Sequence, residues 1–126
     1  MENYDWKNKT IIIVEDEKLN VLLLEKMLIK TGASTIHAKN GREAVNLCRE
    51  NKKIDLILMD VKMPVMDGLV ATKLIKEFRP ETPIIAQTAY VSEDDIKNIK
   101  ESGFDDFIGK PIRQDYLFNI IVKYLE

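Results

Sequence analysis

The sequence predicts a single α/β domain, with a five-stranded parallel sheet and helices on both of its faces. Five compact apolar runs alternate with longer stretches of helical spacing, and the connections between them are short. The chain has 126 residues, of which 45% are hydrophobic. That is enough for one sizeable core and too little for two ordinary domains. We expect a polar leader over residues 1–9 and one domain over residues 10–126.

Short apolar runs predict the strands. Residues 11–14, 56–59 and 84–86 are continuous apolar segments, which suit strands buried on both faces. Residues 34–38 and 104–108 are partly polar and are expected at the two edges of the sheet. Five βα units with right-handed crossovers then place helices on both faces.

The first helix is predicted from leucines at spacings of three and four, with Gly32 as a stop signal. Its expected inward face consists of Leu19, Leu22, Leu23 and Met27. Four further apolar residues make this helix apolar nearly all round: Val21, Leu24, Leu28 and Ile29. Two interpretations stay open, deep packing of the whole helix or a docking face for a partner helix.

The other four helices have clearer end signals. The second follows an Asn-Gly pair at 40–41, the third stops before Pro80, and Ser92-x-x-Asp95 is a capping box for the fourth. Asp115 is a candidate cap for the last. The expected apolar faces are Ala44, Val45, Leu47 and Cys48; Leu69, Val70, Leu74, Ile75 and Phe78; and Leu117, Ile120, Ile121, Tyr124 and Leu125.

Composition excludes several classes of protein. The chain has 19 basic and 21 acidic residues and no block of basic residues, so nucleic-acid binding has no support. The single Cys48 and the single His37 exclude a disulfide framework and a multi-histidine metal site. No apolar stretch approaches the length of about 20 residues that spans a bilayer, and the acidic start is no signal peptide. We expect a cytoplasmic protein that binds neither nucleic acid nor membrane directly.

Chemically capable side chains follow the predicted strands at their carboxyl ends. Glu15 and Asp16 follow the first strand, and Asp60 follows the third. Thr88 and Lys110 follow the fourth and the fifth. Open α/β sheets bind their ligands at this edge. We therefore expect carboxylates, a hydroxyl and an ammonium group in one crevice.

Three carboxylates in one crevice repel each other unless a cation joins them. Oxygen-only ligands suit Mg²⁺ better than zinc or copper. With Mg²⁺ the local charge becomes −3 + 2 = −1, and Lys110 brings it to zero. A phosphoryl group arriving at Asp60 would meet the metal, the ammonium group and the Thr88 hydroxyl. Each residue alone fits a helix cap or a solvated surface, but their common position favours the functional interpretation.

The chain resembles the response regulator receiver domains of two-component signalling over residues 10–125. The segments that carry the resemblance are IIIVEDE (11–17), LILMDVKMPVMDG (56–68), IIAQTAY (84–90) and FIGKPI (107–112). The resemblance implies a flavodoxin-like sheet with the strand order 2-1-3-4-5. Segments 63–72 and 103–112 resemble receivers of hybrid histidine kinases more than receivers attached to DNA-binding domains.

The resemblance also implies a role for each metal-site residue. Asp16 would ligate Mg²⁺ directly and Glu15 through water, where many receivers have Asp in place of Glu. Asp60 and the backbone carbonyl of Lys62 would complete the protein ligands. Gly68 would let the chain turn tightly into the third helix.

The remaining implied roles concern the phosphoryl group. Asp60 would accept it, and Thr88 and Lys110 would contact its oxygens. Tyr90 would be an aromatic switch that moves inward when Thr88 is drawn to the phosphate. A cis peptide bond before Pro111 would place Lys110.

The implied function is transfer of a phosphoryl group from a phosphohistidine partner, a histidine kinase or a histidine phosphotransfer domain, onto Asp60 with Mg²⁺. A conformational switch then relays the signal. Such a domain is not an enzyme in the ordinary sense, although it supports its own phosphorylation and dephosphorylation, and it could stand alone or belong to a hybrid histidine kinase. Phe118 and Val122 of the last helix fit core packing or, alternatively, a homodimer through the last two helices.

Three other classes of protein are rivals to this interpretation. A flavin-binding flavodoxin needs a phosphate cradle after the first strand, where Glu15, Asp16 and Glu17 would repel phosphate. A haloacid-dehalogenase-type phosphatase needs a D-x-D after a strand, and neither the segment 16–18 nor the segment 60–62 supplies one. A phosphate-independent, receiver-like interaction module remains the alternative. It would show no Mg²⁺-dependent labelling.

Overall fold

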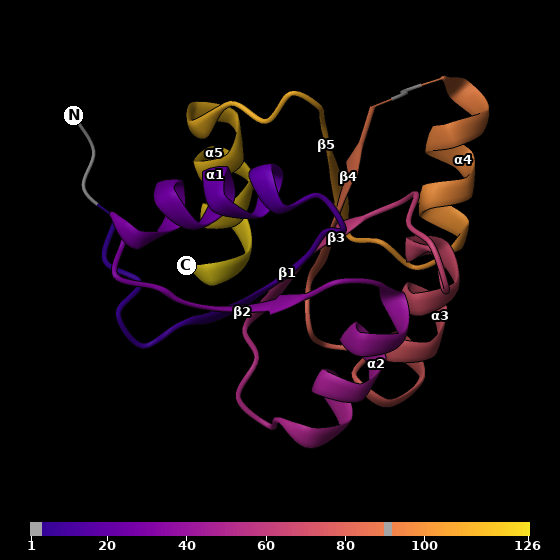
Figure 1. Ribbon diagram of the computed structural model, residues 1–126, viewed down its shortest axis with the longest axis horizontal. Helices are drawn as coiled ribbons and strands as arrows, with labels where there is room; N and C mark the ends of the chain where they lie inside the picture. The colour runs from indigo at the N-terminus through magenta and orange to yellow at the C-terminus, as the bar shows by residue number, and fades with distance from the viewer. Residues whose placement is uncertain (1–3, 90–91) are drawn as a thin grey trace.

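A parallel sheet lies between two layers of helices in the computed structural model (Figure 1), which describes residues 4–89 and 92–126. The strands are β1 (Thr10–Val14), β2 (Ser34–Ala38), β3 (Leu56–Asp60), β4 (Ile84–Thr88) and β5 (Asp106–Gly109). The helices are α1 (Lys18–Ile29), α2 (Gly41–Glu50), α3 (Gly68–Phe78), α4 (Glu93–Glu101) and α5 (Gln114–Leu125). Among the described residues, no helix has the length and apolar character needed to cross a membrane.

All four strand pairs are parallel, in the order β2-β1-β3-β4-β5. This confirms the predicted fold class and strand order. The register pairs Val14 with Met59 and Asp60 with Gln87, so that the strands end together along one edge. The partly polar strands β2 and β5 form the two edges of the sheet, as their composition predicts.

Alternate residues of the central strands face opposite helical layers. Ile12, Ile57 and Ile84 pack with α2, α3 and α4 in one core cluster. Ile13 and Leu58 pack with α1 and α5 in the other. Strand side chains alternate between faces, so a strand buried on both sides must be apolar at every position, and this explains the continuous apolar runs.

The predicted inward face of α1 is wrong. Val21, Leu24 and Leu28 are the buried residues of this helix, and they recur at spacings of three and four as well. Leu19, Leu22 and Leu23 are exposed by 68%, 52% and 47%. Because α1 is apolar nearly all round, its periodicity fits more than one face equally well.

Two smaller expectations also need correction. Asp115 does not cap α5, because the helix begins at Gln114 and its N-cap residue is Arg113, without a side-chain cap. Val70 and Phe78 of α3 are 48% and 38% exposed, whereas smaller residues of that helix, Ala71 and Thr72, face the core. The capping box of α4 is confirmed: Ser92 accepts from the backbone of Asp95, and the Asp95 carboxylate accepts in return.

The N-terminal segment contributes a core side chain. Trp6 is 1% exposed and packs with the α1 and α5 layer. Its ring contacts those of Tyr4 and Phe118, and its indole N–H donates to the Glu126 carboxylate at 2.8 Å. The segment that composition describes as a polar leader thus reaches into the packing of the domain.

Candidate functional site

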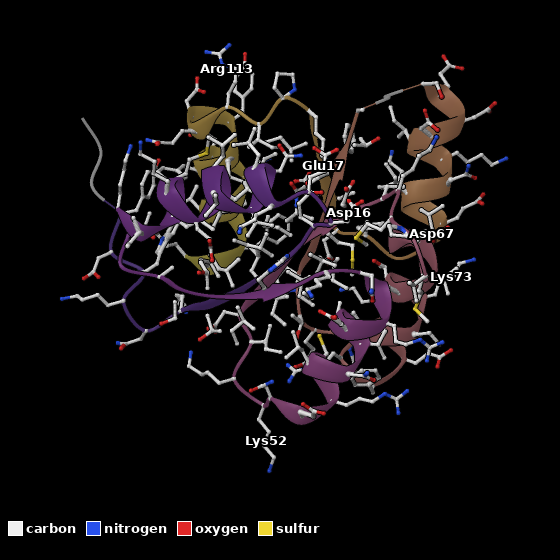
Figure 2. The ribbon with its side chains drawn as sticks, in the orientation of Figure 1. Asp16, Glu17, Lys52, Asp67, Lys73 and Arg113 are labelled. Carbon is white, nitrogen blue, oxygen red and sulfur yellow. The ribbon has the colours of Figure 1, made fainter. Side chains whose placement is uncertain are left out.

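Five predicted site residues line one cleft at the carboxyl ends of the strands. The cleft has a volume of about 170 Å³ and lies where β1, β3, β4 and β5 end. Asp16 and Glu17 are found at this end of the sheet in Figure 2. The predicted residues that line the cleft are Asp16, Asp60, Lys62, Thr88 and Lys110. Tyr90 lies outside the described residues.

The three predicted carboxylates form one cluster. Glu15, Asp16 and Asp60 each offer an oxygen, and these oxygens all lie within 4.8 Å of one another. Glu15 is fully buried and Asp60 is 6% exposed, whereas Asp16 is open to solvent. The cluster therefore has two buried carboxylates at its base and one at its mouth.

Lys110 joins the two buried carboxylates. Its Nζ lies 3.1 Å from Glu15 Oε1 and 3.1 Å from Asp60 Oδ2. Its backbone N–H donates to the Thr88 carbonyl at 2.8 Å, and the bond between Lys110 and Pro111 is cis. The loop after β5 is thereby fixed against the end of β4, with the ammonium group aimed at the carboxylates.

The two buried carboxyls have opposite shifts in pKa. Burial raises the pKa of Asp60 to about 7, and the nearby Glu15 charge adds to this against the opposing effect of Lys110. Burial also acts to raise the pKa of Glu15, but the hydrogen bonds from Lys110 and Asp60 outweigh it and leave that pKa lowered. Burial acts to lower the pKa of Lys110, and its two carboxylate partners leave it raised. Of the two buried carboxyls, Asp60 is thus the one whose ionised form the protein disfavours.

The donor set fits a hard cation. All side-chain ligands on offer are carboxylate oxygens, with one ammonium group beside them and an opening to water at Asp16. Mg²⁺ prefers oxygen ligands and keeps several waters, and a divalent cation would offset the burial and the Glu15 charge that together raise the pKa of Asp60.

Gly68 holds the loop after β3 close to Asp60. A Cβ at this position would lie 2.2 Å from the Asp60 carbonyl oxygen, and the Gly68 N–H donates to Val61 at 2.8 Å. The predicted need for glycine here is confirmed, but its cause differs. The φ angle of Gly68 is not among the positive ones, so the close approach of two backbones requires the glycine.

Sequence reasoning missed two neighbours of the site. His37 is exposed, and its Nε2 lies 2.8 Å from the Glu15 carbonyl oxygen. Gln87 is 1% exposed, next to Thr88 in β4. Its signal in the sequence is a polar residue inside a run that is otherwise suited to a fully buried strand.

The chain matches the response regulator receiver domain family over residues 11–122. It is 39% identical over 120 residues to the polar-differentiation response regulator DivK of Brucella anthropi, covering 93% of this chain and 96% of DivK. It is 36% identical over 115 residues to the transcription factor SKN7 of Candida albicans, covering 91% of this chain but 20% of SKN7. The relatives thus include proteins of similar length and far longer ones.

Two solved structures carry information about the site. The receiver domain of the sensor histidine kinase PA1611 from Pseudomonas aeruginosa, with a magnesium ion coordinated in its active site cleft, has a TM-score of 0.85 and 33% identity over 93% of this chain and 97% of that one. The receiver domain of Ssk1 from Saccharomyces cerevisiae, in a complex with the histidine phosphotransfer protein Ypd1, has a TM-score of 0.87 and 32% identity over 93% of this chain and 88% of that one. The comparisons lend no support to a homodimer through the last two helices.

Proposed function

This chain belongs to the response regulator receiver domain family of two-component signalling, and from that premise we propose that Asp60 accepts a phosphoryl group from a phosphohistidine partner. The observation that carries the proposal is the pair of 3.1 Å contacts from Lys110 Nζ to Asp60 and Glu15 within a cleft of carboxylates. A buried carboxylate with an ammonium group beside it and an open mouth is the arrangement that an in-line transfer requires.

The transfer exchanges one bond at phosphorus for another. An ionised oxygen of Asp60 attacks, the phosphorus–nitrogen bond to the partner histidine breaks, and an acyl phosphate forms on Asp60. Lys110 neutralises charge on the phosphoryl oxygens, and the Thr88 hydroxyl donates to one of them. Water that enters through the solvent-open side of the cleft later attacks the same phosphorus. The bond between phosphorus and Asp60 then breaks, and the carboxylate is restored.

Mg²⁺ is the cofactor we propose for this cleft. Asp16 and Asp60 would ligate it, Glu15 would bind through water, and the Lys62 backbone carbonyl would add a further ligand. The ion supplies positive charge to the phosphoryl oxygens in transit. The magnesium ion coordinated in the Pseudomonas aeruginosa receiver domain supports this assignment.

The signal leaves through a change in population between two conformations. The phosphoryl group contacts Thr88 and Lys110 only in the phosphorylated state. The free energy of these contacts shifts the equilibrium between the two conformations. A shift from mostly inactive to mostly active requires about 5 kcal/mol of such difference. Tyr90 would follow Thr88 in this switch, as the family resemblance implies.

The partner would dock on α1. An exposed apolar surface slightly longer than one helical turn lies on this helix, beside the cleft. It consists of Leu19, Leu22 and Leu23. An apolar helix face of this kind suits a helical partner. The complex of the Saccharomyces cerevisiae Ssk1 receiver with its phosphotransfer protein supports a partner of that class.

Cys48 is a buried free thiol, which suits the reducing cytoplasm where we place this function.

Intact-protein mass after incubation with phosphoramidate tests the proposal. The wild-type protein is expected to gain one phosphoryl group when Mg²⁺ is present and none when EDTA replaces it. Asp60→Asn, which keeps the size of the side chain, is expected to gain none under either condition. A folded wild-type protein that gains no phosphoryl group with Mg²⁺ would contradict the proposal and leave a phosphate-independent interaction module.

A further inference from the structure

Gln87 carries a buried amide group beside the residues of the phosphoryl site. Its side chain is 1% exposed, and among the described residues neither its Nε2 nor its Oε1 has a hydrogen-bond partner. Both atoms have essentially no accessible surface, so a molecule in the solvent does not reach them. Because buried polar groups in folded proteins are nearly always satisfied, the partners of this amide must come from the protein itself.

The amide lies in the same row of side chains as the proposed phosphoryl acceptor. Gln87 of β4 is the register partner of Asp60 on β3. Two residues earlier on these strands, Leu58 and Ile85 face the α1 and α5 layer. Side chains along a strand alternate between its faces, so Asp60 and Gln87 face the same layer from neighbouring strands.

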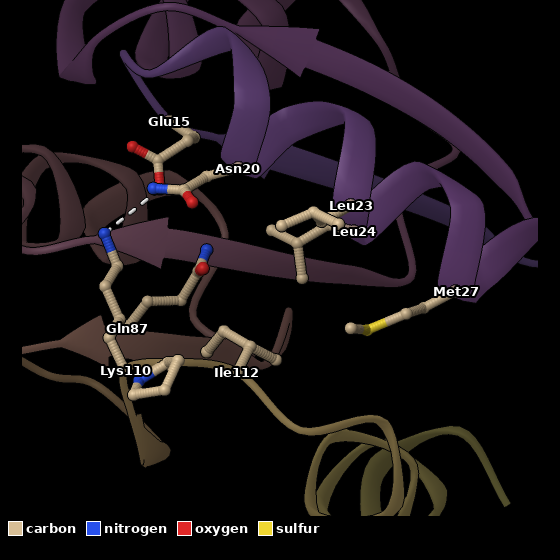
Figure 3. Close-up of a pocket in the computed structure, with 9 residues that line it drawn as sticks. Glu15, Asn20, Leu23, Leu24, Met27, Gln87, Lys110 and Ile112 are labelled. Atoms are coloured by element: carbon tan, nitrogen blue, oxygen red, sulfur yellow. Dashed lines mark hydrogen bonds and ion pairs between the residues drawn. The ribbon is translucent and has the colours of Figure 1, made fainter.

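The same place holds a buried ion pair. Lys110 Nζ donates to Glu15 Oε1 at 3.1 Å, and the other carboxylate oxygen of Glu15 accepts from the Glu17 backbone N–H at 3.2 Å. Glu15, Gln87 and Lys110 line one cavity, and Figure 3 shows their side chains converging at one end of it. The amide is therefore a neighbour of both members of the ion pair.

We propose that Gln87 is a positioning residue, which takes the place of Lys110 beside Glu15 when Asp60 carries a phosphoryl group. The inference rests on the proposed function, in which Lys110 contacts the phosphoryl oxygens. As the ammonium group turns toward them, the Gln87 Nε2 donates to Glu15 Oε1, and the Gln87 Oε1 accepts from Lys110 Nζ.

An amide is the side-chain group that suits this exchange. Glu15 is fully buried, and a buried charge that loses its partner is costly. The amide of Gln87 offers one group that donates and one that accepts, so it can stand between a carboxylate and an ammonium group. It adds no charge to a site that already holds three carboxylates and Lys110.

This exchange makes Gln87 part of the conformational switch. The two hydrogen bonds of the amide form only when Asp60 is phosphorylated. In the unphosphorylated state the amide stays buried without them, which destabilises that state. Gln87 therefore shifts the equilibrium toward the phosphorylated conformation.

Gln87→Met is expected to act with opposite signs on the two states, because an unbranched apolar chain of similar length replaces the amide. Beryllofluoride, which binds a carboxylate in the place of a phosphoryl group, is the probe with Mg²⁺, and fluorine NMR measures its affinity. We expect the variant to bind it about tenfold more weakly than the wild type, as the net loss of about one buried hydrogen bond implies. Without beryllofluoride, we expect the urea midpoint of the variant to lie above that of the wild type.

Two further variants separate this role from simple packing. Ile85→Val shortens a buried side chain on the same strand and the same face, and it is expected to lower the urea midpoint without changing the affinity for beryllofluoride. In Lys110→Met, Glu15 lacks the ammonium group in both states, so the amide pairs with it in both. Adding Gln87→Met to Lys110→Met is therefore expected to cause no further loss of affinity.

Unchanged affinity in Gln87→Met would overturn the inference and leave the proposed function intact. A urea midpoint below that of the wild type would overturn it too, because the amide would then have a partner in the unphosphorylated state. Equal losses of affinity in the wild-type and Lys110→Met backgrounds would show that Gln87 does not act through Lys110. A folded wild-type protein that neither gains a phosphoryl group nor binds beryllofluoride would overturn both the inference and the proposed function.

Discussion

Val65 is the non-glycine residue with a positive φ in the described part of the chain. Its φ is +70°, and the hydrogen bond from the Met66 N–H to the Pro64 carbonyl makes it the centre of a γ-turn. This form of the turn is rare, and a β-branched residue at positive φ is an outlier. The turn lies in the loop between Asp60 and Gly68, which shapes one wall of the cleft.

Val65→Gly is therefore expected to stabilise the protein. Relief of the strain adds about 1–3 kcal/mol, and the greater freedom of glycine in the unfolded chain removes about 0.5–1 kcal/mol. The net gain in the free energy of unfolding is about 1 kcal/mol, measurable by urea denaturation. Val65→Ala keeps the Cβ and is the control. A Gly variant less stable than the Ala variant would show that the turn is not strained.

Asp60 makes stability depend on pH between about 5.5 and 8. Its pKa is about 7 in the folded protein and about 3.9 in an unfolded chain, so below about pH 7 the folded state holds a proton that the unfolded state has already lost, and it releases that proton on the way to pH 8. Stability must then fall as pH rises. The lowered pKa of Glu15 and the raised pKa of Lys110 place their own titrations outside this window.

Urea denaturation in metal-free buffer measures this effect. The wild-type protein is expected to lose about 2 kcal/mol between pH 5.5 and 8 relative to Asp60→Asn. Mg²⁺ is expected to restore that loss at pH 8 in the wild type and not in the variant. Parallel pH curves for the two proteins would show that Asp60 ionises normally.

At the scale of elements, the strands were predictable and one helix face was not. β1, β3 and β4 are buried on both sides, so their runs of apolar residues fix where they end. Those ends place Glu15, Asp60 and Thr88 at one edge without any knowledge of side-chain packing. Several stripes along α1 are equally apolar, and the buried face is the one that fits the sheet. Only tertiary packing decides which stripe that is.

The exposed face of α1 leads to a prediction about transfer. Leu22→Asp is expected to slow phosphoryl transfer from a phosphorylated histidine phosphotransfer protein by about tenfold or more, because a charge enters an apolar contact. Labelling by phosphoramidate is expected to stay unchanged, since that donor needs no docking.

Val70→Asp is the matched control for this experiment. Val70 is 48% exposed, against 52% for Leu22, but it lies on α3, which covers the other face of the sheet. Equal transfer rates for Leu22→Asp and the wild type would remove α1 from the docking surface.

At the scale of the whole molecule, the described segment before β1 packs against the C-terminal helix and the residue after it. Trp6 and Glu126 are joined by a hydrogen bond of 2.8 Å, and Tyr4 contacts Phe118 of α5 edge to face. Composition alone could not predict this, because a polar segment with a single tryptophan gives no periodic signal. Only the folded chain brings Phe118 of α5 against that ring.

Trp6→Ala is expected to lower the free energy of unfolding by about 3–5 kcal/mol, as for other large buried aromatic side chains. Trp6→Phe keeps most of the packing but loses the bond to Glu126, and about 1 kcal/mol is expected there. Tyr116→Ala removes an aromatic ring that is 54% exposed and is the control, with a cost below about 1 kcal/mol. Equal stability of Trp6→Ala and Tyr116→Ala would exclude Trp6 from the core.

One carboxylate among three is the proposed phosphoryl acceptor. Glu15, Asp16 and Asp60 offer oxygens within 4.8 Å of one another. Because a phosphoryl group adds the same mass at any of them, the mass of the intact protein cannot show which one carries it. Rapid peptic digestion at low pH, followed by fragment masses of the labelled protein, can do so. We predict the phosphoryl group on Asp60 alone; a phosphoryl group on Glu15, Asp16 or His37 would contradict the account.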